Sequence, residues 1–252
     1  MWWNRILEDA PQFFTYYNAI FVLQAMGTTL ALTIVGCGIG FFFGFLIAGI
    51  RSTHSRLLLP LRLLVTLYVE IFRRIPFLVI LFIVMFGVQA ISRGISLFVI
   101  ALISICLVST AFMSEIIRAG MESVPKAQRE AAEAMNFGFW RTLLSVILPQ
   151  AWKVILPPGF AFMVMFIKDT ALASQMGVVE LTFTGKMFVG RGFSPFLVYG
   201  VVLAGYFVMS YPLSRLGAYL EKRLATSRSR ESLERVWTGP GSVQREPVGE
   251  QG

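Results

Sequence analysis

The stretch IFVLQAMGTTLALTIVGCGIGFFFGFLIAGI, residues 20–50, decides the fold class, because none of its 31 positions carries a charge. About 20 apolar residues in a helix suffice to cross the roughly 30 Å hydrocarbon core of a bilayer. Of all 252 residues, 56% are hydrophobic and only 14% charged, where soluble domains have roughly one quarter charged. No small-residue cleavage pattern closes a short apolar core, so we interpret the stretch as a retained span. The sequence therefore predicts an all-α integral membrane protein.

Five membrane passages are expected, at about residues 20–50, 58–91, 95–120, 143–167 and 195–220. The second is irregular, because EIFRRIP interrupts the apolar run with Glu70, Arg73, Arg74 and Pro76. Charges at membrane depth are tolerated where they face protein or a water-filled cavity, and broken helices are common in transporters for that reason. The interruption is therefore a candidate functional site. The alternative places it at the membrane edge, with the arginines among the lipid headgroups.

The loops on the two sides of the membrane differ in their Lys and Arg content. One side collects Arg51, Arg56, Arg62, Lys126, Arg129, Arg141, Lys222, Arg223, Arg228 and Arg230, and the other Arg5, Arg93, Lys168, Lys186 and Arg191. The richer side is expected to be cytoplasmic. With an odd number of spans, the N-terminus is then outside and the C-terminus inside.

Three regions follow from this topology. Residues 1–18 contain the tryptophans and tyrosines expected at a headgroup interface and are predicted to lie along the outer surface. Residues 19–224 form the membrane domain. Residues 225–252 are polar, contain Gly and Pro, and show no sustained periodicity, so a disordered cytoplasmic tail is expected.

Composition argues against several other functions. The net charge of +8 comes from basic residues beside apolar spans, not from a stripe interleaved with aromatics, so nucleic acid is not an expected partner. Cys37 and Cys106 lie inside expected spans and are interpreted as packing residues. His54 is the only histidine and sits in a basic loop, which argues against an imidazole-based metal site. We expect no cofactor and no metal.

Within the first span, Gly36, Gly40, Gly44 and Ala48 recur every fourth residue. Small residues at this spacing lie on one helix face and allow another helix to approach closely. The neighbour is either a helix of the same subunit or one across a subunit interface.

A second stretch, VPKAQREAAEAMNFGFWRTLLSVILPQ at residues 124–150, breaks the apolar character of the chain. Pro125 suits a first helical turn, and Ala127, Ala131, Ala134 and Met135 follow helical spacing on one face. Phe137, Phe139 and Trp140 come directly after. A short amphipathic helix outside the bilayer is predicted, shaped for a groove on another protein. The chemistry leaves open a plain membrane-surface loop.

The same stretch resembles the cytoplasmic motif of ABC-importer permeases, which reads Glu-Ala-Ala, three residues, glycine, nine residues, Ile, one residue, Leu-Pro. The matching residues are Glu130, Ala131, Ala132, Asn136 in the glycine place, Val146 in the isoleucine place, Leu148 and Pro149. Asn is the non-glycine residue that best tolerates the left-handed backbone of such a turn. With YVEIFRRIPFLVILF, SEIIRAGMESVPKAQ, IKDTALAS, GVVEL and SYPLSRL, the chain is similar to the polar amino acid permeases over roughly residues 18–224.

This resemblance implies a subunit of an ATP-driven importer of polar amino acids in the bacterial inner membrane. It implies a coupling helix at residues 124–141 that docks into a cytoplasmic ATPase, with candidate contacts Glu130, Ala131, Ala132, Asn136, Phe137, Gly138 and Trp140. A second permease chain, identical or related, and an external solute-binding protein are the other implied partners. The sequence has no phosphate-binding loop of the Gly-x-x-x-x-Gly-Lys-Ser/Thr type and no assembled catalytic set, so the ATPase is expected to be a separate chain and no catalytic residue is assigned.

The candidate residues of the solute path are Glu70, Arg73, Glu115 and Ala161. Glu70 and Glu115 lie among apolar residues, where an unpaired carboxylate is heavily penalised. Either Arg73, Arg74 and Arg118 neutralise them as structural pairs, or one acid receives the solute's ammonium group, as the resemblance implies. At Ala161 the resembled permeases tend to have Asn. The alternatives for function are a permease for another small solute and a membrane scaffold or receptor subunit that translocates nothing.

Overall fold

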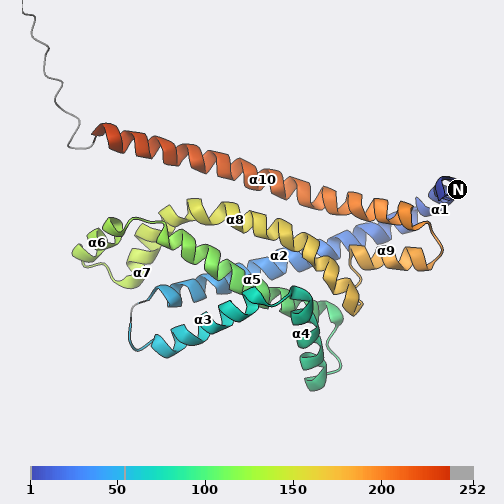
Figure 1. The fold of residues 1–252 in the computed structure, drawn as a ribbon, viewed down its shortest axis with the longest axis horizontal. Helices are drawn as coiled ribbons and strands as arrows, with labels where there is room; N and C mark the ends of the chain where they lie inside the picture. Colours follow the sequence, from blue (N-terminus) through green and yellow to red (C-terminus); the bar gives the residue numbers. More distant parts are fainter. Residues whose placement is uncertain (1, 54, 239–252) are drawn as a thin grey trace, which may run out of the picture.

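The computed structural model describes residues 2–53 and 55–238, and every regular element in these two ranges is a helix (Figure 1). In chain order the elements are α1 (Trp2–Phe13), α2 (Tyr16–Ser52), α3 (Leu59–Arg74), α4 (Phe77–Ile91), α5 (Leu97–Glu122), α6 (Lys126–Ala134), α7 (Phe139–Thr142), η1 (Leu143–Ile147), α8 (Leu148–Asp169), η2 (Thr170–Met176), α9 (Leu181–Gly190) and α10 (Pro195–Thr238). Of the two η elements, η1 is a π-helix and η2 a 3-10 helix.

The expectation of about five spans is confirmed. Four helical stretches are long and apolar enough to cross a membrane: α2, α5, residues 139–176 and residues 195–224. The pair α3 and α4, bent by 116°, gives a fifth if it forms one broken span. In Figure 1 the helices α2, α5, α8 and α10 run roughly along the long axis of the molecule, with α6 at one end and α1 at the other.

Helix α5 forms the centre of the bundle, and α2 packs along it. The small-residue face of α2 makes this approach possible: a Cβ added to Gly40 would lie 2.0 Å from Ser109 Oγ, and one added to Gly44 2.8 Å from the backbone nitrogen of Ser114. Ser109 also donates a hydrogen bond to the carbonyl of Gly36 at 2.9 Å. Of the two predicted alternatives, the neighbour is therefore a helix of the same subunit.

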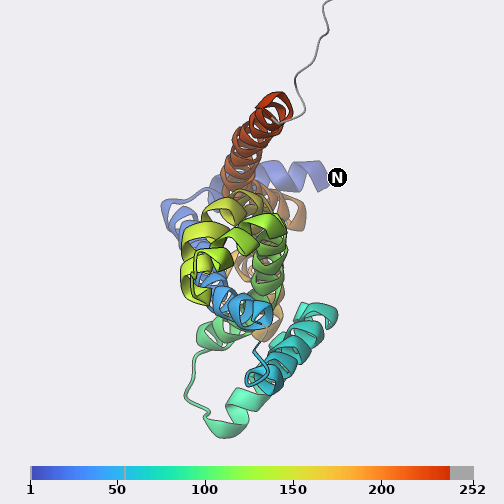
Figure 2. The same ribbon diagram turned by 90° about the vertical axis from the view of Figure 1, so that its left-hand side faces the viewer.

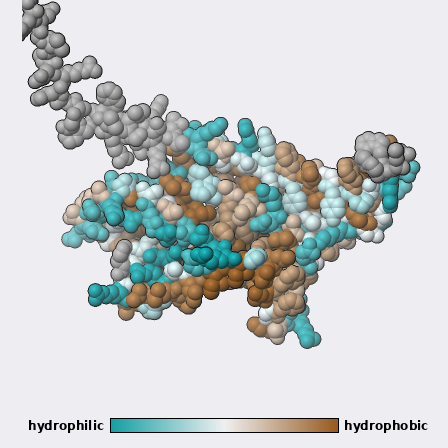
Figure 3. Space-filling view, viewed as in Figure 1, coloured by the Kyte–Doolittle hydropathy of each residue, from teal (hydrophilic) through white to brown (hydrophobic). Residues whose placement is uncertain are grey.

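The expected interruption of the second passage is a sharp bend. A residue before proline is pushed out of the helical region by contact with the proline ring, and Ile75, with φ −90° and ψ 136°, is the extended residue between α3 and α4. Beyond Pro76, α4 turns away from the bundle, as Figures 1 and 2 both show. The apolar surface of the pair forms the brown lower edge in Figure 3, whereas the end around α6 is largely teal.

The last helix is longer than expected. α10 continues to Thr238, so the backbone of residues 225–238 is helical where a disordered tail was predicted. The reason is that this segment, although polar, contains no Gly or Pro and therefore no residue that ends a helix. Residues 239–252, the remainder of the predicted tail, lie outside the described residues.

Candidate functional site

The predicted amphipathic helix between the third and fourth spans is α6. It begins after Pro125, and the chain reverses just beyond its end at Asn136, whose φ of 60° is the one positive value at a non-Gly residue in the described ranges. The amide of Asn136 donates to the carbonyl of Glu133, and that of Phe137 donates to the carbonyl of Ala132. The left-handed turn expected at Asn136 is confirmed, and it directs the chain from α6 into α7.

Only one side of α6 rests on the rest of the chain. Ala132 is buried there, and Arg129 Nη2 donates to the carbonyl of Met121 at 2.7 Å, which ties α6 to the end of α5. Glu130 and the alanines at positions 127, 131 and 134 are exposed. Of the predicted contact residues, Ala132 thus faces inward, whereas Glu130 and Ala131 face outward.

The aromatic residues that follow extend this exposed side. Trp140 is 61% exposed and Met135 68%, and Phe139 packs edge-on against Trp140 with ring centroids 5.3 Å apart. Phe137 differs, because it is half-buried and covered by the guanidinium of Arg141 at 4.2 Å. We call the exposed set of Glu130, Ala131, Ala134, Met135, Gly138, Phe139 and Trp140 the coupling surface.

A π-helical turn joins the coupling surface to the next span. η1 lies between α7 and α8, and the amide of Leu148 bonds to the carbonyl of Leu143, five residues back. Pro149 follows directly, and a proline clashes with the carbonyl four residues before it. The wider π-helical turn accommodates the proline ring without ending the helix, so α7, η1 and α8 form one continuous helical segment.

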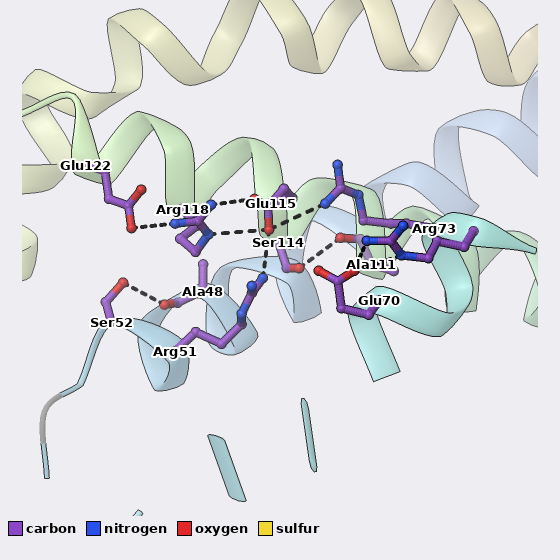
Figure 4. Close-up of polar contacts among 11 residues, drawn as sticks. Ala48, Arg51, Ser52, Glu70, Arg73, Ala111, Ser114, Glu115, Arg118 and Glu122 are labelled. Atoms are coloured by element: carbon purple, nitrogen blue, oxygen red, sulfur yellow. Dashed lines mark hydrogen bonds and ion pairs between the residues drawn. The ribbon is translucent and has the colours of Figure 1, made fainter. Parts of the chain in front are cut away.

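A cluster of charged side chains lies where α2, α3 and α5 meet (Figure 4). Glu115 of α5 is its centre: its carboxylate accepts from Arg51 Nη1 of α2 at 2.8 Å and from Arg118 of the same helix. Arg73 of α3 comes within 3.7 Å of the same carboxylate. Arg118 also donates to Glu122. We call these five residues the charged cluster.

Structural pairing, one of the two alternatives for the acids, is thus present in the structure. Three guanidinium groups surround Glu115, and the side chain of Arg51 is only 11% exposed. Glu70 is not part of the cluster, because it pairs with Arg74 at 2.7 Å on the exposed side of α3. Glu70 and Glu115 therefore lie in different environments: the Glu70 side chain is 42% exposed and pairs with one arginine, whereas that of Glu115 is 20% exposed and has three guanidinium groups around it.

The role of Arg51 was missed from the sequence, where it was counted only as a loop charge. It lies three residues after Ala48 and so continues the small-residue face of α2 that meets α5. That continuation is the signal that could have identified it.

Arg73 is less completely paired than Arg51. Its distance of 3.7 Å to Glu115 exceeds that of a hydrogen bond, and its guanidinium lies over the ring of Phe112 at 5.6 Å. Phe112 stacks on Phe162 of α8 with centroids 5.2 Å apart. Ala161, the neighbour of Phe162, is exposed on α8. Arg73, near the end of α3, therefore lies beside the stacked rings of Phe112 of α5 and Phe162 of α8.

No three His, Cys, Asp or Glu side chains in the described ranges come together as metal ligands would. What the charged cluster can do is hold three helices together and present one incompletely paired guanidinium. What the coupling surface can do is bury apolar area against a partner.

Comparison with known proteins identifies the family of the chain. Residues 38–226 match the family described as binding-protein-dependent transport system inner membrane component. The chain is 33% identical over 199 residues to a probable glutamine ABC transporter permease protein of Bacillus subtilis (strain 168), covering 79% of this chain and 91% of that protein. It is 36% identical over 197 residues to the L-cystine transport system permease protein of the same organism, covering 78% and 83% respectively. A crystal structure of an amino acid ABC transporter with histidines is similar with a TM-score of 0.74 at 29% identity, over 82% of this chain and 95% of that chain.

Proposed function

The chain belongs to the family of binding-protein-dependent transport system inner membrane components, and from this premise we propose that it is the permease subunit of an ATP-driven importer of polar amino acids. It is a multi-pass membrane protein, and the family implies ATPase and substrate-binding protein partners. The bacterial inner membrane is the proposed location. The relatives named for glutamine and cystine support an amino acid as the solute.

The coupling surface is the observation that carries this proposal. Met135, Phe139 and Trp140 are exposed between α6 and the start of the helical stretch 139–176, at a largely hydrophilic end of the molecule (Figure 3). Exposed apolar clusters of this kind mark sites of protein–protein contact. A scaffold that translocates nothing does not need both such a surface and a broken, charged span.

We propose that the partner at the coupling surface is the cytoplasmic ATPase, which places α6 and the C-terminus inside the cell. The distribution of Lys and Arg among the loops supports this orientation. A second permease chain, identical or related, completes the membrane part of the importer. The proposed regions are an external interfacial segment at 1–18, the membrane domain at 19–224, and a cytoplasmic segment from 225.

The solute path is proposed to pass the charged cluster. Glu115 is already held by Arg51 and Arg118, so its role is to fix the cluster, and a cationic ammonium group would be repelled by the surrounding guanidinium groups. Arg73 is the better candidate for direct solute contact, because a guanidinium binds a carboxylate through two parallel hydrogen bonds. Ala161 would line the aromatic side of the path, and Glu70 would support Arg74 at its rim.

The test is reconstitution of the chain with its ATPase, its second permease chain and its solute-binding protein in liposomes. Each amino acid is presented in turn, and both ATP hydrolysis and uptake are measured. We expect a small set of polar amino acids to stimulate both activities. Stimulation by a different class of small solute would support an importer of that solute instead. Failure of the chain to recruit an ATPase at all would support the scaffold.

Orientation is tested separately by cysteine accessibility. A cysteine at Lys186 should react with an impermeant reagent added from outside, and one at Arg129 should not. The reverse pattern would contradict the proposed topology.

A further inference from the structure

Helix α1 lies at the end of the molecule opposite α6 and contacts the connection between α9 and α10. Arg5 Nη2 donates to the carbonyl of Gly192 at 3.0 Å, and Asp9 Oδ2 accepts from the amide of Ser194 at 2.7 Å. Phe13 is buried and packs edge-on against Phe188 and Phe193, with centroids 5.0 and 5.4 Å away. One side of α1 is thus fixed to residues 188–194, which we call the α9–α10 turn.

A second side of α1 is apolar but not covered by the chain. Leu7 is 60% exposed. Phe14, which follows the last residue of α1 and whose amide still donates to the carbonyl of Ala10, is 64% exposed. Residues seven apart in a helical stretch lie on the same side. Glu8 and Gln12 are exposed on a different side. Helix α1 therefore has more apolar surface than its contacts with the α9–α10 turn bury.

The position of α1 identifies what covers this surface. Figure 2, which looks roughly along the long axis of the bundle, shows α1 extended across that axis, so it runs parallel to the plane of the membrane. Exposed Tyr16 and Tyr17 come two and three residues after Phe14, at the start of the membrane-spanning helix α2, on which Leu23 is also exposed. The exposed side of α1 is thus continuous with a surface that faces lipid, at the depth where tyrosine is enriched.

We propose that α1 is a lipid-bound brace: Leu7 and Phe14 bind the interface of the bilayer, and Arg5, Asp9 and Phe13 hold the α9–α10 turn against it. Amphipathic helices of this kind lie in the plane of the interface with the apolar side in the acyl boundary. The α9–α10 turn contains Gly192 at φ 100°, so its backbone conformation is one that few residues adopt.

Lipid contact is tested by fluorescence quenching. An environment-sensitive fluorophore is attached to a single cysteine at position 7, or at Gln12 as the matched control, in a chain with Cys37→Ala and Cys106→Ala. The protein is placed in nanodiscs that contain phosphatidylcholine with a nitroxide high on the acyl chain. We expect several-fold stronger quenching at position 7 than at position 12. Equal quenching would overturn the proposal, and so would protection of position 7 only on addition of the solute-binding protein, which would make this side a protein-docking surface.

Bracing is tested by hydrogen exchange of the peptide that contains Ser194. The double variant Leu7→Asn/Phe14→Asn should speed exchange in this peptide toward the rate of Asp9→Ala, in which the acceptor itself is removed. For Asp9→Ala the expected increase is about tenfold, the ratio that corresponds to one lost hydrogen bond to a charged group. Gln12→Ala should leave the rate unchanged. If the double variant loses lipid contact without faster exchange, α1 is an anchor only and the brace is refuted.

Discussion

Replacing Trp140 by alanine should weaken binding of the ATPase while leaving the permease folded. The side chain is 61% exposed and lies at the start of α7, where Phe139 is the ring beside it. Because so much of the indole has no intramolecular contact, its removal costs the permease itself little. Removal of the indole instead reduces the binding free energy of the partner that covers it.

The size of the effect follows from the exposed area. A large aromatic side chain has about 250 Å² of surface, so the exposed part of Trp140 amounts to roughly 150 Å². Complete burial of that area at about 25 cal/mol per Å² would contribute at most about 4 kcal/mol. Ordering of side chains and imperfect packing reduce the yield at protein interfaces, so we expect about half, or ~2 kcal/mol. This corresponds to a Kd that is about 30-fold weaker.

The assay is titration of the isolated ATPase onto permease held in nanodiscs, followed by optical biosensing. Tyr219→Ala is the matched control, because Tyr219 is an exposed aromatic side chain on α10 that lies outside the coupling surface. We expect a normal Kd for the control and a raised Kd for Trp140→Ala. An unchanged Kd for Trp140→Ala, with correct membrane insertion, would refute the assignment of the coupling surface.

Three further substitutions test the packing and the charges. Gly40→Val should destabilise the chain by about 3 kcal/mol or more, because the new side chain would overlap Ser109. Gly38→Val is the control and should leave stability unchanged, because a Cβ at Gly38 meets nothing within 4 Å. Thermal unfolding in detergent distinguishes the two variants. Glu115→Gln should cost about 1.5 kcal/mol, the low end for hydrogen bonds to charged groups, because Glu115 is only partly buried; retention of full stability would mean that the charged cluster does not hold the helices. Burial raises the pKa of Glu180, so the protonated carboxyl is favoured in the folded protein. The stability that this protonation contributes should be complete below pH 4.5 and lost as the pH rises through the folded pKa. Glu180→Gln should flatten this dependence of unfolding on pH.

The membrane passages and the bend could be predicted because each rests on local chemistry. Uncharged runs specify helices wherever lipid surrounds them, and Pro76 dictates an extended Ile75 whatever lies nearby. The four-residue spacing of glycines on α2 predicted close packing, but the identity of the partner required knowing that α5 lies beside it. The backbone of Asn136 was predictable for the same local reason, since the turn needs a positive φ.

The charged cluster was only partly predictable. Arg118 lies one helical turn from Glu115 and could be paired with it from spacing alone. Arg51 is 64 residues away, and only the packing of α2 on α5 brings it to the same carboxylate. The end of α10 was misjudged for a different reason: polarity argues against a packed core but does not stop a helix whose backbone hydrogen bonds are satisfied within itself.

The coupling surface and the charged cluster are connected through the end of α5. Arg129 of α6 bonds to the carbonyl of Met121, the residue next to Glu122, and Glu122 is paired with Arg118 of the charged cluster. If α6 moves, either the last turn of α5 therefore moves with it or the hydrogen bond from Arg129 breaks. Because Arg118 shares the carboxylate of Glu115 with Arg51 and Arg73, a shift of that turn changes the contacts of all three helices at once. Of these contacts the one to Arg73 is the longest, so a small movement would change it first, and Arg73 belongs to α3, the helix that ends at the bend before α4.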